Sequence, residues 1–187
     1  MRRIAVLGCA GSGKTTLSLA LGNRLGLPVV HVDSVYWRTD SGFGAEWPAI
    51  HAGLIARDEW ILDGMKPGVL GERLERADTA IFLDLPRRTC FRGLVERRLA
   101  RRTGELAALG AHGRIDRALV RWIWRFPRDV RPVVLEQLRA CSCDVVILSS
   151  RAEVRRFLAG MAAREPLVAV GAGPNLARNR DRGVTHL

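Results

Sequence analysis

Short apolar runs alternate along this chain with longer segments in which apolar residues recur every three or four positions. The short runs predict five strands, at Arg3–Leu7, Val29–Asp33, Trp60–Asp63, Ala80–Leu85 and Val145–Leu148. Several of them are continuously apolar, which is typical of strands covered on both faces. The longer segments predict helices at 15–25, 47–58, 69–77, 87–102, 115–126, 129–140 and 151–163. This order favours an α/β fold, a three-layer sandwich with a parallel sheet between helices, in one domain over residues 1–164.

Two segments lack this periodicity. Residues 165–187, which contain Gly171, Gly173 and Pro174, have no pattern that would bury them, and we expect a loosely ordered tail. The segment Thr103–Gly113 contains three glycines and separates two helical segments. It predicts a mobile loop at which a helical lid, at about residues 98–128, would hinge.

Composition narrows the class of protein. The chain has 187 residues, of which 48% are hydrophobic and 26% charged, which suits one well-buried core and excludes disordered and collagen-like chains. No apolar run approaches the length of about 20 residues that a membrane-spanning helix needs. We therefore expect a soluble protein with no membrane partner.

Positive charge is concentrated in one part of the chain. The net charge is +11, and residues 87–131 carry thirteen basic against four acidic residues, a local excess of nine. Such a block favours a polyanionic partner: nucleic acid, an anionic membrane or a nucleotide triphosphate.

Cysteines and histidines predict no metal centre. The four cysteines, Cys9, Cys90, Cys141 and Cys143, lack the paired spacing of a zinc site and are interpreted as reduced thiols of a cytoplasmic protein. The four histidines are isolated from one another in the sequence, at His31, His51, His112 and His186.

The strongest motif follows the first strand and opens the first helix. It runs Gly8-Cys9-Ala10-Gly11-Ser12-Gly13-Lys14-Thr15, followed by Thr16, and matches the glycine-rich phosphate loop (P-loop) in full. Glycines let successive N–H groups turn toward phosphate oxygens, and the helix N-terminus adds its partial positive charge. Lys14 would reach the β- and γ-phosphates of ATP, and Thr15 would ligate Mg²⁺. The alternative is an incidental glycine-rich turn.

Two aspartates are expected at the same edge of the sheet as this loop. Asp33 ends the second predicted strand and Asp63 the third, and open α/β sheets bind ligands at that edge. Asp63 could hold Mg²⁺ through water, and Asp33 could orient or deprotonate an acceptor hydroxyl. Each also has a structural interpretation, Asp33 as a helix cap and Asp63 in an Asp-Gly turn. Asp84 is interpreted as a strand-end or capping carboxylate outside the site.

Arginines of the basic block are candidates for closing over a triphosphate. An arginine in this role accelerates phosphoryl transfer by about 10³–10⁵. The spacing selects Arg92, Arg97, Arg117 and Arg121, although any one of them could equally be a solvated surface residue. Trp122, Trp124 and Phe126 could stack on bases, but we interpret them as anchors of a helix to the core.

Several blocks of the sequence resemble one known family. Besides the phosphate loop they are Leu25-Gly26-Leu27-Pro28, Val32-Asp33, Glu59-Trp60-Ile61-Leu62-Asp63-Gly64, the stretch 73–86 and Trp122-Ile123-Trp124-Arg125-Phe126-Pro127. Over about residues 3–160 the chain resembles the adenylate-kinase-related proteins known as DNA topology modulation proteins. The resemblance implies a nucleoside-monophosphate-kinase-like P-loop fold with strand order 2-3-1-4-5, and ATP binding. It matches residues 8–15 to the ATP phosphate site, Asp63 to the strand-end acid, and Arg92 with Arg97 or Arg98 to lid arginines.

The chain departs from this family where an acceptor would bind. Met65-Lys66 replaces the usual Asn-Tyr pair, and Ala111-His112-Gly113 replaces Cys-Pro-Glu. We therefore expect a cytoplasmic kinase that transfers the γ-phosphoryl group of Mg·ATP to a small nucleotide or another hydroxyl-bearing metabolite. The alternatives are a DNA-binding or regulatory ATPase that uses the basic block, and an enzyme that only hydrolyses ATP.

Overall fold

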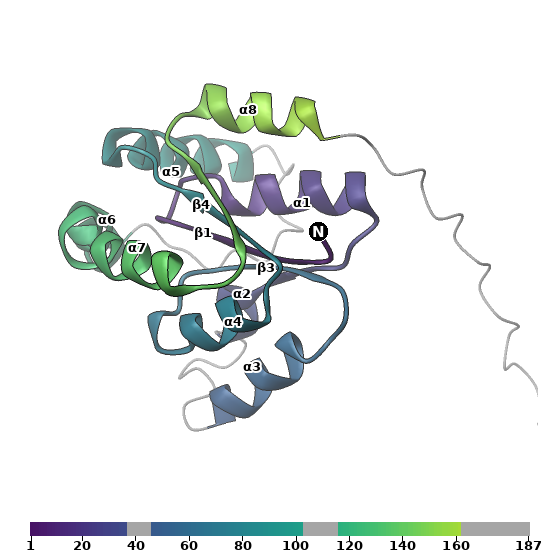
Figure 1. Ribbon diagram of the computed structural model, residues 1–187. Helices are drawn as coiled ribbons and strands as arrows, with labels where there is room; N and C mark the ends of the chain where they lie inside the picture. The colour runs from purple at the N-terminus through teal and green to yellow at the C-terminus, as the bar shows by residue number, and fades with distance from the viewer. Residues whose placement is uncertain (37–45, 103–115, 162–187) are drawn as a thin grey trace, which may run out of the picture.

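A computed structural model describes residues 1–36, 46–102 and 116–161 of the chain. The whole of the expected loop Thr103–Gly113 and the expected tail 165–187 lie outside these residues. Five parallel strands form one sheet in the order β2-β3-β1-β4-β5. This confirms the predicted fold class and strand order. Helices cover both faces of the sheet, with α1, α5 and α8 on one side and α4 and α7 on the other (Figure 1).

The strands lie close to the predicted ranges. Their bounds are Arg3–Gly8 (β1), Val29–His31 (β2), Trp60–Asp63 (β3), Thr79–Leu83 (β4) and Asp144–Leu148 (β5). One boundary differs in a way that matters for the site, because β2 ends at His31 and the next five residues form a short helix, α2 (Val32–Tyr36). The prediction that Asp33 ends a strand was therefore wrong, and Asp33 lies in the first turn of α2 instead.

The remaining helices begin and end within about three residues of the predicted segments. They are Lys14–Leu25 (α1), Trp47–Ile55 (α3), Leu70–Arg76 (α4), Arg87–Arg102 (α5), Arg117–Asp129 (α6), Arg131–Ala140 (α7) and Arg151–Gly160 (α8), with a 3₁₀ turn at Pro67–Val69 (η2). Local caps explain several ends. The Asp116 carboxylate accepts from the Leu119 N–H at 2.7 Å. The Ser150 hydroxyl group accepts from the Glu153 N–H at 3.2 Å and donates to the Glu153 carboxylate at 3.0 Å.

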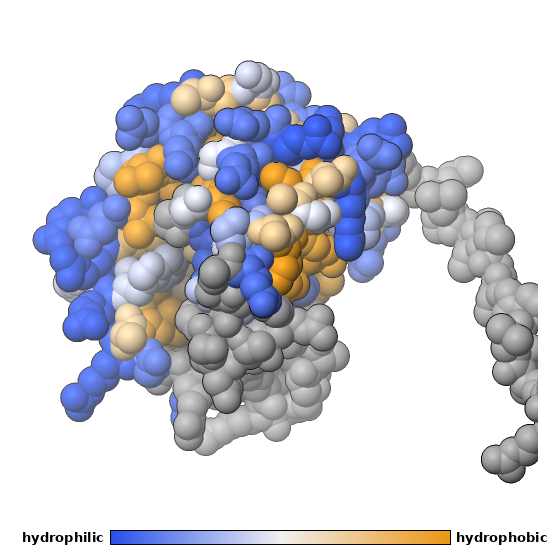
Figure 2. Space-filling view, turned by 90° about the horizontal axis from the view of Figure 1, so that it is seen from below, coloured by the Kyte–Doolittle hydropathy of each residue, from blue (hydrophilic) through white to orange (hydrophobic). Residues whose placement is uncertain are grey.

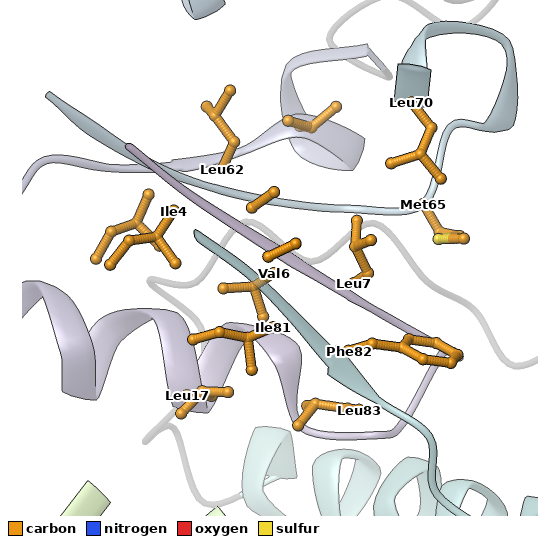
Figure 3. Close-up of a cluster of buried hydrophobic side chains, with 14 of the residues drawn as sticks. Ile4, Val6, Leu7, Leu17, Leu62, Met65, Leu70, Ile81, Phe82 and Leu83 are labelled. Carbon is orange, nitrogen blue, oxygen red and sulfur yellow. The ribbon is translucent and has the colours of Figure 1, made fainter. Parts of the chain in front are cut away.

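The core lies on both faces of the central strands. Ile4, Val6 and Leu7 of β1 and Ile81 and Phe82 of β4 are fully buried. Figure 3 shows them packed with residues from β3 and the adjoining helices. Burial on both faces is what the continuous apolar runs predict for a parallel sheet. On the outer face seen in Figure 2, hydrophilic side chains surround smaller apolar patches.

Burial tests the expectation that the aromatic residues of α6 anchor this helix to the core. Ile123 and Phe126 of α6 are buried, as expected for a core-anchoring helix, but Trp124 is 61% exposed and the Arg87 guanidinium lies 4.3 Å from its ring centroid. The interpretation of Trp124 as a core residue was wrong.

Within residues 1–36, 46–102 and 116–161, no helix is both long enough and apolar enough to cross a bilayer.

Candidate functional site

The loop from Gly8 to Gly13 connects the buried end of β1 to the first turn of α1. Gly8, Gly11 and Gly13 all have positive φ, at 147°, 75° and 94°. The Ser12 N–H donates to the Cys9 carbonyl at 3.2 Å, which closes a tight turn. Successive backbone N–H groups in such a turn, at a helix N-terminus, form a concave anion-binding surface.

The side chain of Lys14 folds back over this loop toward the end of β1. Its ammonium group donates to the carbonyl oxygens of Gly8 at 2.9 Å and Cys9 at 3.0 Å. Thr15 and Thr16 follow it in the first turn of α1, Thr15 half-buried and Thr16 exposed. The positive charge of Lys14 and the hydroxyl group of Thr15 are therefore held next to the curled backbone.

Close packing of α5 fixes the other side of the loop. A Cβ atom on Gly11 would lie 2.1 Å from the Cys90 carbonyl oxygen, and one on Gly93 would lie 2.1 Å from the Gly11 carbonyl oxygen. The backbone of α5 therefore rests directly on the backbone of the phosphate loop. Gly93 was missed at the sequence level, although a glycine inside a helix costs about 1 kcal/mol relative to alanine and so signals a packing requirement.

The cysteine of the loop is buried and unreactive. A hydrogen bond with the Cys90 thiol and burial both raise the pKa of Cys9, so that it stays protonated. None of the four cysteines, all of which lie in the described part of the chain, forms a disulfide in the structure.

The structure places Asp33 and Asp63 at the same edge of the sheet as the loop. Asp63 ends β3, lies in register with Val6 of β1 and is 3% exposed. Asp33 follows β2 and is half-buried. Between them Gly64, with φ of 135°, leaves no room for a side chain, because a Cβ atom there would lie 3.1 Å from the Asp33 N and Oδ1 atoms. The Asp33 carboxylate is thus packed against the end of β3.

His31 is a partner of Asp63 that the sequence did not reveal. Its Nδ1 atom lies 2.8 Å from Asp63 Oδ2. The hydrogen bond to Asp63 raises the pKa of His31, and partial burial opposes this. His31 and Asp63 occupy paired positions on adjacent parallel strands, so their side chains point to the same face. The strand register decides this contact, and no local pattern in the sequence encodes it.

The residues available for Mg²⁺ fit a site that is completed by the nucleotide. Thr15 and Asp63 supply hard oxygen ligands beside the phosphate loop, which is the donor type that Mg²⁺ prefers. In the described part of the chain there is no group of three His, Cys, Asp or Glu side chains that would hold a metal alone. Phosphate oxygens and water would therefore supply the other ligands.

A buried arginine lies behind these acids. Arg73 of α4 is 0% exposed, and its Nη1 atom donates to the Gly64 carbonyl at 2.9 Å while its Nε atom donates to His51 Nε2 at 3.4 Å. Burial lowers its pKa to about 10, and the charges of Asp33 and Asp63 oppose that shift. Burial, together with the charge of Arg73, lowers the pKa of His51 to about 4. Sequence reasoning missed Arg73 because arginine is almost never fully buried. It missed His51 because no residue near it in the sequence indicates its contact with Arg73.

The predicted closing arginines are found in different surroundings. Arg92 and Arg97 lie on α5, where Arg92 donates to Glu96 at 2.8 Å. Arg117 and Arg121 are exposed on α6. Glu96 also accepts two bonds from Arg151, and these contacts lower the pKa of Glu96 to about 2. A role for any of these four arginines at phosphate stays a prediction.

Comparison with known proteins identifies the fold. No protein-family model and no curated protein matches the sequence significantly. Among solved structures, shikimate kinase from Acinetobacter baumannii in complex with shikimate is 15% identical, with 85% of this chain and 89% of that chain covered and a TM-score of 0.57. Deoxyadenosine kinase from M. mycoides with bound dATP is 11% identical, with 85% and 98% covered and a TM-score of 0.53. The chain has a P-loop kinase fold.

A second shikimate kinase, from Bacteroides thetaiotaomicron, supports the same conclusion. It is 18% identical, with 84% of this chain and 94% of that chain covered and a TM-score of 0.54. Likeness at these identities establishes the P-loop kinase fold and does not transfer a substrate. The resemblance to the DNA topology modulation proteins stays a prediction from the sequence.

Proposed function

We propose that this protein is a kinase that transfers the γ-phosphoryl group of Mg·ATP to a small nucleotide or to a hydroxyl group of another small molecule. The observation that carries the proposal is the arrangement at one sheet edge: a phosphate loop with three positive-φ glycines, Lys14 lying over it, and two carboxylates beside it. The P-loop kinase fold of the structural neighbours supports it.

On the nucleotide side, the backbone N–H groups of the loop and the N-terminus of α1 bind the phosphates. Lys14 exchanges its two carbonyl contacts for β- and γ-phosphate oxygens, and so places its charge where negative charge develops during transfer. Thr15 directly, and Asp63 through water, are the residues that would hold Mg²⁺. When bound, Mg²⁺ neutralises charge on the phosphates and orients the transferred group.

On the acceptor side, Asp33 is the residue that accepts the hydroxyl proton or fixes its direction. It is half-buried and packed against Gly64, so its carboxylate is held in one place. His31 holds Asp63 by the 2.8 Å contact, which leaves Asp33 as the acid available to the acceptor. Arginines of α5 and α6, with Arg92, Arg97, Arg117 and Arg121 as the candidates, would approach the transferred phosphoryl group when the lid closes.

A screen of ATP consumption tests the proposal. Purified protein is incubated with Mg·ATP and with pools of nucleoside monophosphates, nucleosides and sugar acids, and release of ADP is measured. We expect one pool to accelerate turnover far above the rate without acceptor. Equal rates in all pools would leave only ATP hydrolysis and would contradict the transferase proposal.

A second candidate function is supported by one observation. Trp124 is exposed on the basic block with Arg87 over its ring, an arrangement that suits stacking on a nucleic-acid base. A DNA-binding or regulatory ATPase would use this surface. We favour the kinase because the sequence has no motif known for reading a DNA groove.

A further inference from the structure

We infer that the acceptor carries an oxyanion, a carboxylate or phosphate group, which Arg73 binds while Asp33 faces the reacting hydroxyl. The inference rests on the proposed function, because it names the class of acceptor for that site. It is carried by the hydrogen-bonding capacity that buried side chains of α3 and α4 leave unused.

Arg73 is a buried cation with an unused donor group. A guanidinium group has five N–H donors in a planar fork, and here Nε and Nη1 donate to the neutral acceptors His51 Nε2 and Gly64 O. Within the described residues Nη2 has no hydrogen-bond partner, and no carboxylate lies within ion-pair distance of the guanidinium. Burying a charged donor without a partner is unfavourable, and a bound oxyanion would supply that partner.

Two neighbouring side chains have unused donors as well. His51 accepts from Arg73 through Nε2, so the proton of its neutral ring is on Nδ1. That nitrogen lies 3.6 Å from Glu72 Oε2, beyond hydrogen-bond distance, and within the described residues it has no hydrogen-bond partner. Trp47 lies one turn earlier on α3, with its ring centroid 5.8 Å from that of His51, and its indole N–H has no hydrogen-bond partner in the part of the chain that the structure describes. The Glu72 carboxylate beside them is 56% exposed and lies beyond hydrogen-bond distance of His51, so a bound anion would be the partner for these donors.

The position of this group relative to the acids fits one acceptor molecule. Arg73 donates a hydrogen bond to the carbonyl of Gly64. Gly64 follows Asp63 in the sequence and packs against Asp33. An acceptor whose hydroxyl group is oriented by Asp33 would therefore extend its other end toward α4. Because Arg73 has no exposed surface and His51 of α3 packs on it, α3 must move away from α4 when the anion binds.

The alternative role for Arg73 is structural: its charge offsets those of Asp33 and Asp63, which both act on its pKa. The two roles predict different kinetics. A residue that only supports the acids affects charged and uncharged acceptors alike. A residue that binds an anion affects only the acceptors that carry one.

The test uses the full chain and the acceptor found in the ATP-consumption screen, compared with its uncharged counterpart. For a sugar acid the counterpart is the parent sugar, and the phosphate ester of the same sugar is a second anionic arm that distinguishes phosphate from carboxylate. A nucleoside monophosphate that accepts on its own phosphate would overturn the inference, because the reacting oxygen is then not a hydroxyl group. We expect the wild-type kcat/KM to favour the anionic member at least about 100-fold, since a site built for a polar group discriminates strongly against an analogue that lacks it. An acceptor that is itself uncharged, or equal use of both members, would overturn the inference.

Variants separate binding from structure. Arg73→Gln should raise the KM of the anionic acceptor at least about 10-fold, leave the KM of ATP unchanged and remove the preference for charge, and Arg73→Lys should keep part of it. Arg57→Gln, at an exposed position between α3 and β3, is the control and should change nothing. If Arg73→Gln keeps the preference, or impairs both members equally, the inference is wrong.

Two further results decide the case in which Arg73→Gln does not fold and the case in which the proposed function fails. If Arg73→Gln does not fold, the melting temperature of the wild type is measured with each acceptor. The anionic acceptor should raise the melting temperature and its uncharged counterpart should not. Equal shifts would overturn the inference. If no pool accelerates ATP turnover, the proposed transferase function fails and the inference fails with it. If an uncharged acceptor is phosphorylated, the function stands and the inference alone falls.

Discussion

At the scale of single residues, this edge of the sheet combines acidic and basic side chains that are buried to different extents. Arg73 interacts electrostatically with Asp33 and Asp63, and Lys66 with Asp33, while Lys14 lies on the phosphate loop. Asp63 is tied to His31, while Asp33 has a fixed position beside Gly64. This division suggests that the two carboxylates have separate tasks, one toward Mg²⁺ and one toward the acceptor.

The first prediction concerns Asp33. Asp33→Asn should lower kcat by about 10²–10⁴, because an amide cannot accept the hydroxyl proton, and the KM of ATP should hardly change. Asp58→Asn, at an exposed position before β3, is the control and should retain wild-type kinetics. Steady-state kinetics with the acceptor from the screen measures both. Wild-type kcat in Asp33→Asn would remove Asp33 from the mechanism.

His51 gives a prediction for stability against pH. Its pKa is lowered from 6.5 to about 4 in the folded protein, so between pH 6.5 and 4 the unfolded chain binds a proton that the folded protein does not. Its contribution is complete above pH 6.5 and is lost as the pH falls to 4, by about 3 kcal/mol in the free energy of unfolding. Urea unfolding of wild type and His51→Gln between pH 4.5 and 7 tests this. The variant should show a shallower loss, and parallel curves would contradict the assignment.

Residue-level prediction from the sequence was uneven for physical reasons. The phosphate loop, Asp33 and Asp63 were found because each lies in a local pattern next to a strand. The contact of His31 with Asp63 depends on strand register, and the burial of Arg73 depends on how α4 packs under β3. Neither is encoded in the residues nearby.

At the scale of elements, the decisive contact is that of α5 with the phosphate loop. The helix touches the loop backbone through Cys90 and Gly93, so a shift of α5 would be transmitted to the phosphate-binding N–H groups. The same helix carries Arg92 and Arg97. Its packing therefore links the loop to the region expected to close.

Gly93→Ala tests this contact. Its new methyl group would meet the Gly11 carbonyl, and we expect a loss of about 1–3 kcal/mol in the free energy of unfolding despite the better helix propensity of alanine, together with weaker binding of an ATP analogue. Gly53→Ala in α3 has open space around the new methyl group and should instead gain about 0.5–1 kcal/mol. Equal effects of the two substitutions on chemical unfolding would show that α5 does not rest on the loop.

Element boundaries also show where sequence patterns stop being informative. The strands and most helices were placed within a few residues, because apolar periodicity reports burial directly. The run Val29–Asp33 looked like one strand, but it divides at His31 because the chain turns into α2 as it leaves the sheet. Trp124 fits the periodic pattern of α6 and yet faces outward beside Arg87.

At the scale of the whole molecule, the parallel sheet brings the phosphate loop after β1 and the acids after β2 and at the end of β3 to one edge. Helices cover both faces of this sheet (Figure 1). The alternation of strands and helices predicted the class of fold, and the resemblance to a kinase family implied the strand order that the structure has. The acceptor was not predicted, because in our proposal its class depends on residues of α3 and α4 that meet only in the folded chain.

The net charge of +11 gives a prediction about nucleic acid. For a kinase we expect only weak, non-specific duplex binding, with a Kd of about 10⁻⁴–10⁻⁶ M at physiological salt, and no change in Trp124→Ala. Fluorescence anisotropy across a salt series measures this. Tight binding that weakens steeply with salt, at a slope near 0.9 per phosphate contact, and that is lost in Trp124→Ala, would favour the DNA-binding alternative.

The central claim is that the loop starting at Gly8 binds the phosphates of ATP, and calorimetric titration with a non-hydrolysable ATP analogue and Mg²⁺ tests it most directly. The wild type should bind the analogue, and Lys14→Ala should bind it about 10- to 100-fold more weakly, because charge-assisted hydrogen bonds to phosphate are lost. Arg24→Ala, at the far end of α1, should bind like the wild type. Equal affinity of wild type and Lys14→Ala would contradict the account.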